Sequence, residues 1–447
     1  MIDSRLRQVI NQVRPGVPIP VIVELRTNPT PSTARELAGM GLGNVRPSAT
    51  SPLVYGKATA DVLEQLNKSP IVAKIFYDEP VYTHQFFPFG QTVEQEVIIP
   101  LSESVRATGA PKLWEEGYLG QGVKVAVIDT GVSQTHPMLR GALKGVHSAV
   151  PNETVEDANS HGTWCCAAVA GRSVAYKNQE LVGMAPAADL YALKALSDKG
   201  SGQMSWVMEC IEKAITDFQV DIISMSLGSL FDNGGVDPIS RMVNDVTQRH
   251  NVLCTIAVGN SFLPVTVGSP GGAVGALTVG AVSLQLPTAK APASFSSKGP
   301  ATSLVMKPDC AAPGGNILAP GYMETILAAG KQGGYASMAG SSMATPHVAG
   351  GTALLRQQKR DLSRLELEQI LAAAAFPNPK DTLTGYGFFQ VDRLATYLGK
   401  AIPPVAEVQK AIAAANAALY APIAMFPRPE TEELRKVRLP VFRGLAA

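Results

Sequence analysis

Five long stretches of nearly unbroken apolar residues limit the fold of this chain more than any other feature. Strands that are buried on both faces have this character, because neither face alternates with polar residues that meet water. Stretches of helical period lie between them, at 202–218 and 238–250. The alternation predicts an α/β fold with a doubly wound, mostly parallel sheet. The five runs are VKVAVID (123–129), ADLYALKAL (188–196), VDIISMSLG (220–228), NVLCTIAVGN (251–260) and ALTVGAVS (276–283).

A smaller α+β unit is predicted before this sheet. Its strands and helices alternate as β-α-β-α-β, with room for one more strand, which is typical of a ferredoxin-like split βαβ plait. The predicted strands are 20–25, 52–58 and 71–82, and the predicted helices are 33–41 and 59–69. The chain therefore divides into an N-terminal domain (1–90) with a linker to about 104, a main domain (105–399) and a C-terminal extension (400–447). The extension holds one helix candidate, 405–419, and nothing that indicates chemistry.

Charge and hydropathy argue against two classes of partner. The 447 residues carry a formal net charge of +1, so an electrostatic footprint for nucleic acid is not expected. No apolar run approaches the roughly 20 residues that span a bilayer, so no membrane partner is expected. The opening residues, MIDSRLRQVINQVRPG, lack the apolar core of a secretory signal. A cytoplasmic location is the expectation, or secretion if the chain has been trimmed.

Four polar residues stand at predicted strand ends or helix starts: Asp129, His161, Asn260 and Ser342. Taken singly, each has an ordinary explanation as a helix cap or a turn residue. In a parallel α/β sheet, however, ligands bind beyond the carboxyl ends of the strands. Attack on an amide carbonyl needs a nucleophile, a base, a carboxylate that orients the base, and a donor for the oxyanion. The four residues supply this set.

The order of these residues along the chain excludes other hydrolase classes. An aspartic peptidase needs a second D-[ST]-G besides the one at Asp129, and the sequence has none. An α/β-hydrolase needs its histidine after the serine, but only His347 follows Ser342, five residues later on the same predicted helix. The cysteine pair at 165–166 lies one turn along the helix of the candidate base and points elsewhere, which disfavours a thiol nucleophile.

Several motifs in this order resemble the subtilisin-type serine peptidases, the subtilases. They are DTG (129–131), HGT (161–163), GN (259–260) and GSSMATPHVAG (340–350), with further likeness across roughly 105–399. The resemblance implies that Ser342 is the nucleophile, His161 the general base and then acid, and Asp129 the orienting carboxylate. It also implies that the side-chain amide of Asn260 and the backbone N–H of Ser342 form the oxyanion hole.

The same resemblance implies a set of substrate-binding residues. An edge strand at Gly200, Ser201 and Gly202 would pair with the substrate backbone. Ser226 would support the region of the catalytic aspartate, and Leu227, Gly228 and Gly268 would line the pocket for the residue before the scissile bond. No charged residue falls at the matching pocket positions, and Ser261 stands where some relatives carry an acid. An uncharged, large or apolar side chain is therefore expected in this pocket.

The N-terminal unit resembles the propeptide of the family. Its role would be that of an intramolecular chaperone and inhibitor, whose end leaves through the active-site cleft after self-cleavage. The cut is expected near 83–87, although the spacing to Asp129 permits a site up to about 100. The expected partners are protein or peptide substrates and this propeptide, and the chain is expected to be a monomer.

Two departures from the family pattern lie near the predicted site. The stretch HPMLR carries Met138 where most subtilases have the aspartate of their strong calcium site, and a thioether is not a hard-cation ligand. The loop 172–183 also differs from the usual calcium loop. The strong site is therefore expected to be lost, with calcium elsewhere still open and no cofactor required for the chemistry. Pro346 is expected in the first turn of its helix, where an N–H has no partner.

These observations predict a serine endopeptidase proenzyme that works through an acyl-enzyme. Two alternatives stay open: a catalytically idle pseudopeptidase that only binds protein, and an esterase acting on small acyl groups through the same residues.

Overall fold

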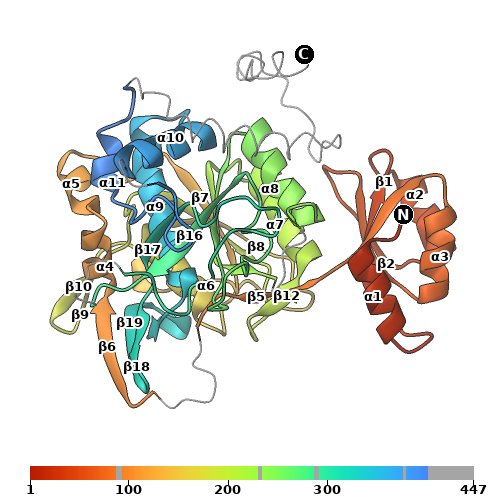
Figure 1. Ribbon diagram of the computed structural model, residues 1–447, viewed down its shortest axis with the longest axis horizontal. Coiled ribbons are helices and arrows are strands. Elements are labelled where there is room, and N and C mark those ends of the chain that lie inside the picture. Colours follow the sequence, from red (N-terminus) through yellow and green to blue (C-terminus); the bar gives the residue numbers. More distant parts are fainter. Residues whose placement is uncertain (87–92, 230–233, 286–290, 376–378, 401–447) are drawn as a thin grey trace.

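The computed structural model describes residues 1–86, 93–229, 234–285, 291–375 and 379–400. Figure 1 shows a small N-terminal unit beside a larger one, with strand β5 running from the first into the second. The helix candidate at 405–419 lies outside the described residues. No helix in these ranges is long and apolar enough to cross a membrane.

A seven-stranded sheet forms the centre of the larger unit, in the order β17-β16-β15-β13-β7-β11-β8. Every neighbouring pair in it is parallel, so the predicted fold class is confirmed. The five apolar runs became its five inner strands. The edge strands β8 and β17 were not predicted, because β8 (LKGVHS) is half polar and β17 (CAAP) is only four residues long. The strands are β7 (Lys124–Asp129), β8 (Leu143–Ser148), β11 (Asp189–Lys194), β13 (Ile222–Met225), β15 (Leu253–Ala257), β16 (Ala276–Val282) and β17 (Cys310–Pro313).

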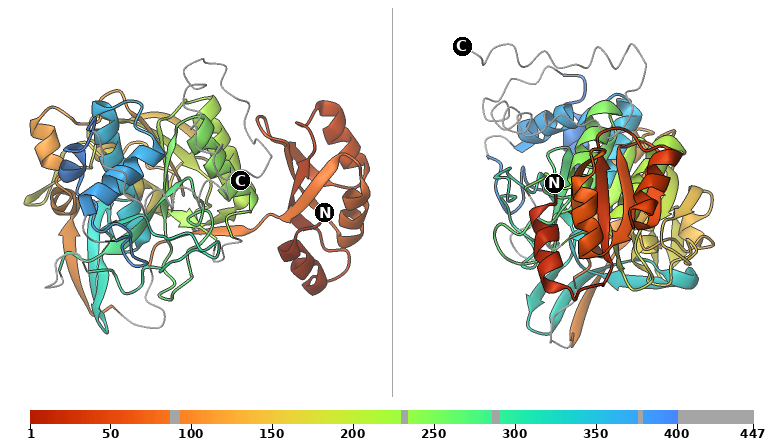
Figure 2. Two further views of the ribbon diagram at one scale, coloured as in Figure 1. Left: turned by 45° about the horizontal axis from the view of Figure 1, so that its top comes forward. Right: turned by 90° about the vertical axis from the view of Figure 1, so that its right-hand side faces the viewer.

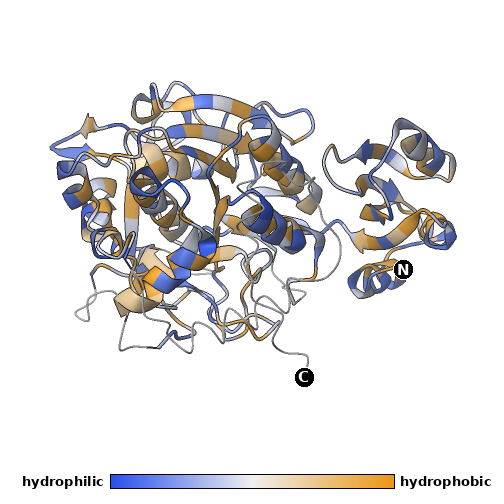
Figure 3. Cartoon of the chain, turned by 90° about the horizontal axis from the view of Figure 1, so that it is seen from above, coloured by the Kyte–Doolittle hydropathy of each residue, from blue (hydrophilic) through white to orange (hydrophobic). Residues whose placement is uncertain are grey.

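Helices cover both faces of this sheet. Alternate residues of β7 enter different cores: Val125 and Val127 pack in the core that holds α6 and α9, whereas Ala126 and Ile128 pack with α7 and α8. Figure 3 shows hydrophobic residues along these strands and both kinds of residue along the covering helices. Burial on both faces explains the apolar runs of the sequence. The helices are α6 (His161–Ala170), α7 (Met204–Thr216), α8 (Pro238–Arg249) and α9 (Ser341–Gln358).

Shorter elements surround this core. A second sheet holds β18 (Asn316–Ala319), β19 (Tyr322–Ala329) and β20 (Tyr335–Met338), and β6 (Gln95–Pro100) pairs in parallel with β19. Part of the predicted linker is therefore ordered structure, because β6 and the start of α4 lie before residue 104. The remaining elements are β9 (Val174–Tyr176), β10 (Gln179–Leu181), α4 (Leu101–Ala107), α5 (Ala110–Glu115), α10 (Arg364–Ala375), α11 (Val391–Ala395), and the 3₁₀ turns Pro137–Leu139 and Lys331–Gly333.

The N-terminal unit is a four-stranded antiparallel sheet in the order β2-β3-β1-β4, with α2 and α3 in its crossovers. Strand β2 fills the place that the sequence left open. The single strand predicted at 71–82 is wrong: it divides into β4, which pairs with β1, and β5, which pairs with strands of the larger unit. Between them the carboxylate of Asp78 accepts the Ser205 N–H at 2.8 Å. The elements are α1 (Ser4–Gln12), β1 (Ile19–Leu25), α2 (Pro31–Gly39), β2 (Gly43–Pro47), β3 (Leu53–Ala58), α3 (Ala60–Lys68), β4 (Val72–Tyr77) and β5 (Pro80–Thr83).

The sheet of the N-terminal unit packs on α7 and α8 of the larger unit (Figure 2). Its apolar face, which includes Ile22 and Phe76, shares one buried core with these helices. Arg241 of α8 donates to both oxygens of Glu24, at 2.9 and 3.2 Å. Because the contact is both apolar and charge-paired, it fixes the orientation from which β5 enters the larger unit.

A buried cluster of charges joins the end of the main domain to the sheet. Asp309, just before β17, accepts from Lys307 at 2.7 Å, from Lys380 at 2.6 Å and from Arg364 of α10 at 3.1 Å. The three cations hold the pKa of Asp309 well below its usual range, against the opposing effect of burial. The carboxylate therefore links three segments that are distant in sequence.

Replacing Asp309 by asparagine would leave three buried cations without their shared anion. We expect Asp309→Asn to lower the free energy of unfolding by about 3–5 kcal/mol, measured by urea denaturation. The measurement uses a Ser342→Ala background, which prevents self-digestion. The control is Asp361→Asn, an exposed carboxylate, which should change stability by no more than about 0.5 kcal/mol. Equal effects of the two substitutions would contradict this prediction.

Candidate active site

Asp129 and His161 meet at the carboxyl edge of the sheet. Asp129 is the last residue of β7 and His161 the first of α6, and the two side chains are fully buried. His161 Nδ1 lies 2.6 Å from Asp129 Oδ1, which also accepts the Thr130 N–H at 2.7 Å. The other ring nitrogen of His161, Nε2, has no hydrogen-bond partner in the described structure. A carboxylate that holds Nδ1 leaves Nε2 free to accept a proton.

Asp157 positions this pair and was not identified from the sequence. One of its oxygens accepts the Thr163 N–H at 2.9 Å and hydroxyl at 2.6 Å, and the other accepts the Thr130 hydroxyl at 3.0 Å. Burial alone would raise the pKa of Asp157, but hydrogen bonds from Thr163, and then from the backbone N–H groups of Ser160 and Asn159, lower it. The carboxylate therefore ties the start of α6 to the loop after Asp129. An aspartate four residues before a histidine gave no sequence signal by itself.

Ser342 is the second residue of α9, and Gly340 makes room for the backbone that lies against the start of this helix. The φ of Gly340 is +147°, and a Cβ there would stand 2.5 Å from the carbonyl oxygen of His84. The small residues around Ser342 thus allow a peptide backbone to approach the helix start. The Ser342 hydroxyl donates to the carbonyl of Ser226 at 2.9 Å in this structure.

Pro346 shapes the same helix from its second turn, not from its first as predicted. The helix begins at Ser341, so the carbonyl that the missing N–H would have bonded is that of Ser342. That carbonyl instead accepts the hydroxyl of Ser226 at 2.8 Å. Ser226 was expected to support the catalytic aspartate, but its single hydroxyl proton is directed to Ser342. The proline thus frees an acceptor that joins α9 to the chain between β13 and β14.

Asn260 follows β15 and is oriented by the start of α9. Its Oδ1 accepts the Ser341 N–H at 3.0 Å, which turns Nδ2 the other way, toward the carbonyl of His84. The Ser341 hydroxyl in turn accepts the Gly259 N–H at 3.2 Å. The amide is therefore positioned before any charge develops, which is what electrostatic stabilisation of an oxyanion requires.

The carbonyl oxygen of His84 lies between the two predicted oxyanion donors. Asn260 Nδ2 donates to it, and the backbone N–H of Ser342 donates to it at 3.3 Å. His84 belongs to the segment that leaves the N-terminal unit. The peptide bond between His84 and Gln85 is thus the one presented to Ser342.

Strand β5 enters the cleft as the middle strand of a three-stranded antiparallel sheet. On one side it pairs with β12 (Ser201–Gln203), with Ser201 opposite Tyr82, and on the other with β14 (Leu227–Gly228). The register continues past the strand, since Thr83 N donates to Gly200 O at 3.0 Å and His84 N to Ser226 O at 3.1 Å. Gly200, Ser201, Gly202, Ser226, Leu227 and Gly228 therefore all line the bound backbone.

The imidazole of His84 is buried and lies against two glycines. A Cβ on Gly228 would lie 2.7 Å from its Cε1, and a Cβ on Gly268 would lie 3.7 Å from the same atom. Burial, and secondarily the nearby His161, lower the pKa of His84 from 6.5 to about 4. The pocket thus holds an uncharged ring at neutral pH.

Comparison with known proteins identifies the family. Residues 120–390 match the model of the Subtilase family, Peptidase_S8. The chain belongs to the subtilase family. It is 34% identical to Subtilisin E of Bacillus subtilis (strain 168) over 347 residues, which is 76% of this chain and 80% of that protein. Serine protease AprX of the same strain is 36% identical over 62% of this chain and 67% of its own, and Subtilisin of Bacillus pumilus 36% over 64% and 95%. This subtilase is therefore a serine endopeptidase.

Other potentially reactive side chains near the site have structural surroundings. Burial raises the pKa of Cys165 well above its usual value, so this thiol stays protonated although it lies 4.0 Å from His161 Nδ1. The described residues hold one grouping with metal-ligand character, Asp129, His161 and Cys165, and it coincides with the site itself. His347 is packed as predicted, bonding Met343 O at 2.7 Å and the Ser104 hydroxyl at 2.8 Å.

Met138, which the sequence analysis singled out in place of a calcium-binding aspartate, lies beside an arginine that binds backbone carbonyls. Met138 is completely buried and offers only a thioether. Next to it, the Arg172 guanidinium donates to four backbone carbonyls, three of them at 3.3 Å. The Arg172 guanidinium thus supplies to these carbonyl oxygens the kind of positive charge that a metal cation supplies elsewhere. The four acceptors are the carbonyls of Gly141, Ala170, Pro186 and Ala188.

Replacing this guanidinium should destabilise the fold. We expect Arg172→Ala to lower the free energy of unfolding by about 1–3 kcal/mol, because several carbonyls lose a charged donor. The change is measured by thermal denaturation in a Ser342→Ala background, with the exposed Arg140→Ala as control. Equal effects of Arg172→Ala and Arg140→Ala would contradict the role given to Arg172.

Proposed function

We propose that this subtilase is a self-processing proenzyme, in which residues 1–84 fold on the active site and the His84–Gln85 bond is the first substrate. One observation carries the proposal: the His84 carbonyl accepts from both Asn260 Nδ2 and the Ser342 N–H. A carbonyl held by two such donors is polarised for attack. The paired backbone on both sides of β5 is the recognition mode of an extended peptide substrate.

The chemistry follows from the groups around this carbonyl. Ser342 Oγ turns from the Ser226 carbonyl toward His161 Nε2, gives up its proton there and attacks the His84 carbon. Asp129, at 2.6 Å from Nδ1, stabilises the imidazolium that forms. The oxyanion collapses, His161 returns the proton to the nitrogen of Gln85, and that amine leaves. A water molecule then gives a proton to His161 and attacks the acyl carbon of His84. The bond from this carbon to Ser342 Oγ breaks, His161 returns the proton to Oγ, and the carboxylate of His84 is released.

Specificity for an uncharged residue before the scissile bond is part of the proposal. The His84 ring is buried, and in the described structure no carboxylate, lysine or arginine acts on its charge, whereas the nearby His161 does. Desolvation would therefore penalise a lysine or a glutamate, since neither would find a counter-charge. Other protein and peptide substrates are expected to follow the same rule.

Intact-mass analysis of the purified wild type and of Ser342→Ala, incubated side by side, tests the proposal. We expect the wild type to yield two fragments, 1–84 and 85–447, and Ser342→Ala to keep its full length. Asn260→Ala should cut at the same bond but more slowly, by a factor of about 100 or more, a magnitude established on subtilisin itself. N-terminal sequencing of the larger fragment should begin at Gln85.

Other results of this experiment would favour the alternatives. If neither protein is cut and neither hydrolyses casein, the site only binds protein. If small esters are cleaved but casein is not, the chain is an esterase that uses the same residues. A wild-type cut at another bond would show that the His84 carbonyl is not the one attacked.

Protonation of His84 should make the hold on the N-terminal segment pH-dependent. A histidine outside the pocket titrates near 6.5 again, whereas in the pocket its pKa is about 4. The released segment therefore binds a proton that the bound one does not. Binding is fully favourable above about pH 6.5 and weakens as the pH falls toward 4. We expect the ratio of the dissociation constants of fragment 1–84 at pH 5 and at pH 7.5 to be about 10-fold larger or more than the same ratio for the His84→Asn protein.

The matched control is His84→Asn, which is neutral across this range. Two carboxyls at the same interface act in the opposite direction, because burial raises the pKa of Asp78 to about 6 and also raises that of Glu212. They contribute equally to both proteins, so the difference between the two pH profiles isolates His84. Identical profiles would show that its protonation has no part in binding.

A further inference from the structure

The residue two positions after the presented bond, Phe86, is held between two aromatic rings. Its ring is stacked on that of Phe295, with centroids 4.7 Å apart and planes at 10°. It meets the ring of Phe262 edge to face, at 5.6 Å and 72°. Only 5% of Phe86 is exposed. Its backbone N–H donates to Ala339 O at 2.8 Å, so the main chain is fixed while the ring enters the slot.

The loop that carries Phe262 has a strained conformation at this point. Phe262 has a φ of +65°, and Leu263 N donates back to Ser261 O at 2.7 Å, which are marks of the rare γ-turn with positive φ. Such a conformation costs an ordinary residue on the order of 1–3 kcal/mol and persists where surrounding contacts impose it. The turn directs a ring that is 38% exposed onto Phe86.

Contacts with the segment after Phe295 impose this conformation. Phe262 N donates to Phe295 O at 3.0 Å, and Ser261 N to the Ser297 hydroxyl at 3.0 Å. Lys298 Nζ donates to the carbonyl of Phe262. The two rings are thus parts of one braced unit, and Asn260 of the oxyanion hole lies two residues before one of them.

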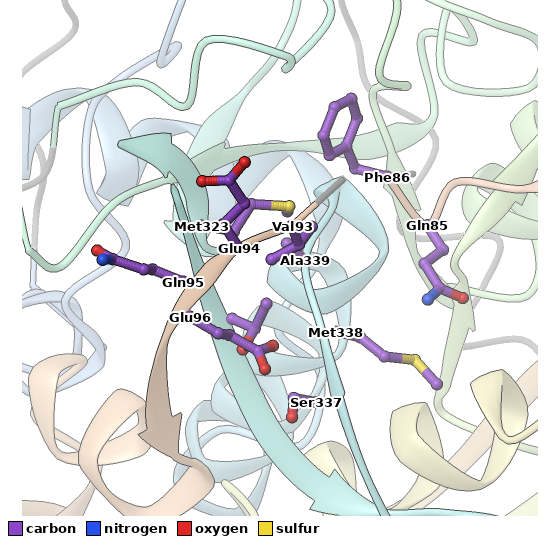
Figure 4. Close-up of a pocket in the computed structure, with 11 residues that line it drawn as sticks. Gln85, Phe86, Val93, Glu94, Gln95, Glu96, Met323, Ser337, Met338 and Ala339 are labelled. Carbon is purple, nitrogen blue, oxygen red and sulfur yellow. The ribbon is translucent and has the colours of Figure 1, made fainter. Parts of the chain in front are cut away.

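A cavity of about 480 Å³ lies beside this slot, and Phe86 is one of its lining residues, with Gln85, Glu94, Glu96 and Met338 among the others. Figure 4 shows the ring of Phe86 directed away from Met338, whereas the other labelled side chains gather below it. The position of the Phe86 ring is therefore determined by its contacts with the two aromatic rings and not by the cavity.

We propose that Phe262 and Phe295 form a clamp that selects an aromatic side chain two residues after the scissile bond, in this chain and in its other peptide substrates. The proposal rests on the proposed endopeptidase function and names a specificity of the same site. A flat ring satisfies the stacked and the edge-to-face contact together, each favourable for aromatic pairs beyond the area that they bury. A small side chain would leave the slot unfilled.

Two internally quenched peptides test the clamp on the self-processed wild type after its N-terminal fragment has been removed. One carries residues 80–86 of this chain, PVYTHQF, and the other has alanine in place of the final phenylalanine. We expect kcat/KM to be about 10-fold higher for the phenylalanine peptide. In Phe262→Ala the preference should fall to about twofold or less. Leu263→Ala, which removes the neighbouring side chain, 64% exposed, is the control and should keep the wild-type preference.

The outcomes separate the clamp from the function on which it depends. Equal kcat/KM for the two peptides in the wild type would overturn the clamp, even where Phe262→Ala fails to fold. An unchanged preference in Phe262→Ala, or in Phe262→Leu where the alanine variant is unstable, would overturn the assignment to this ring. A histidyl p-nitroanilide has no residue two positions after its scissile bond. If the wild type cleaves neither peptide nor this anilide, the proposed function itself fails, and the clamp with it.

Discussion

Parallel pairing of β7, β13 and β15 brings the carboxyl ends of these strands to one edge of the sheet, and the site depends on this convergence. Asp129 ends β7, Ser226 follows β13 and Asn260 follows β15. Helix α9 packs beneath all three strands and brings Ser342 to the same edge. Strands buried on both faces cannot shift their register without exposing a core, so the relative positions of these residues are set by the packing of the whole domain.

Polar contacts then orient the site residues that the sheet brings close together. Asp157 fixes the start of α6 against the loop after Asp129, and Ser341 turns the amide of Asn260. Pro346 has no N–H, so the carbonyl of Ser342 has no helical partner there. That carbonyl accepts the Ser226 hydroxyl instead. These contacts are short, buried and made largely by backbone groups. They hold the donors in place before a substrate arrives, which lowers the reorganisation needed during the reaction.

The sequence predicted the inner strands and the principal site residues because both leave strong local signals. Continuous apolar runs indicate strands buried on two faces, and DTG, HGT and GSSMATPHVAG are distinctive motifs. The edge strand β8 was missed because half of its residues are polar, so it shows no apolar run. Asp157 and Phe262 were missed because their roles depend on partners distant in sequence. The break between β4 and β5 arises because β5 pairs with strands of the other unit, and no local pattern encodes those contacts.

The two sides of the presented bond are anchored to different neighbours. Before Gln85, the chain is held by β12 and β14 and by the N-terminal unit, while after it β6 is built into the sheet of β19. A cut at this bond would therefore produce two unlike ends. The new carboxylate at His84 would belong to a separate molecule, whose occupancy of the cleft falls on dilution. The new amino terminus would stay tethered through β6, so its effective concentration at the cleft would be independent of dilution. Full opening of the cleft thus involves two equilibria: the intermolecular dissociation of the fragment that ends at His84, and the intramolecular displacement of the tethered amino terminus.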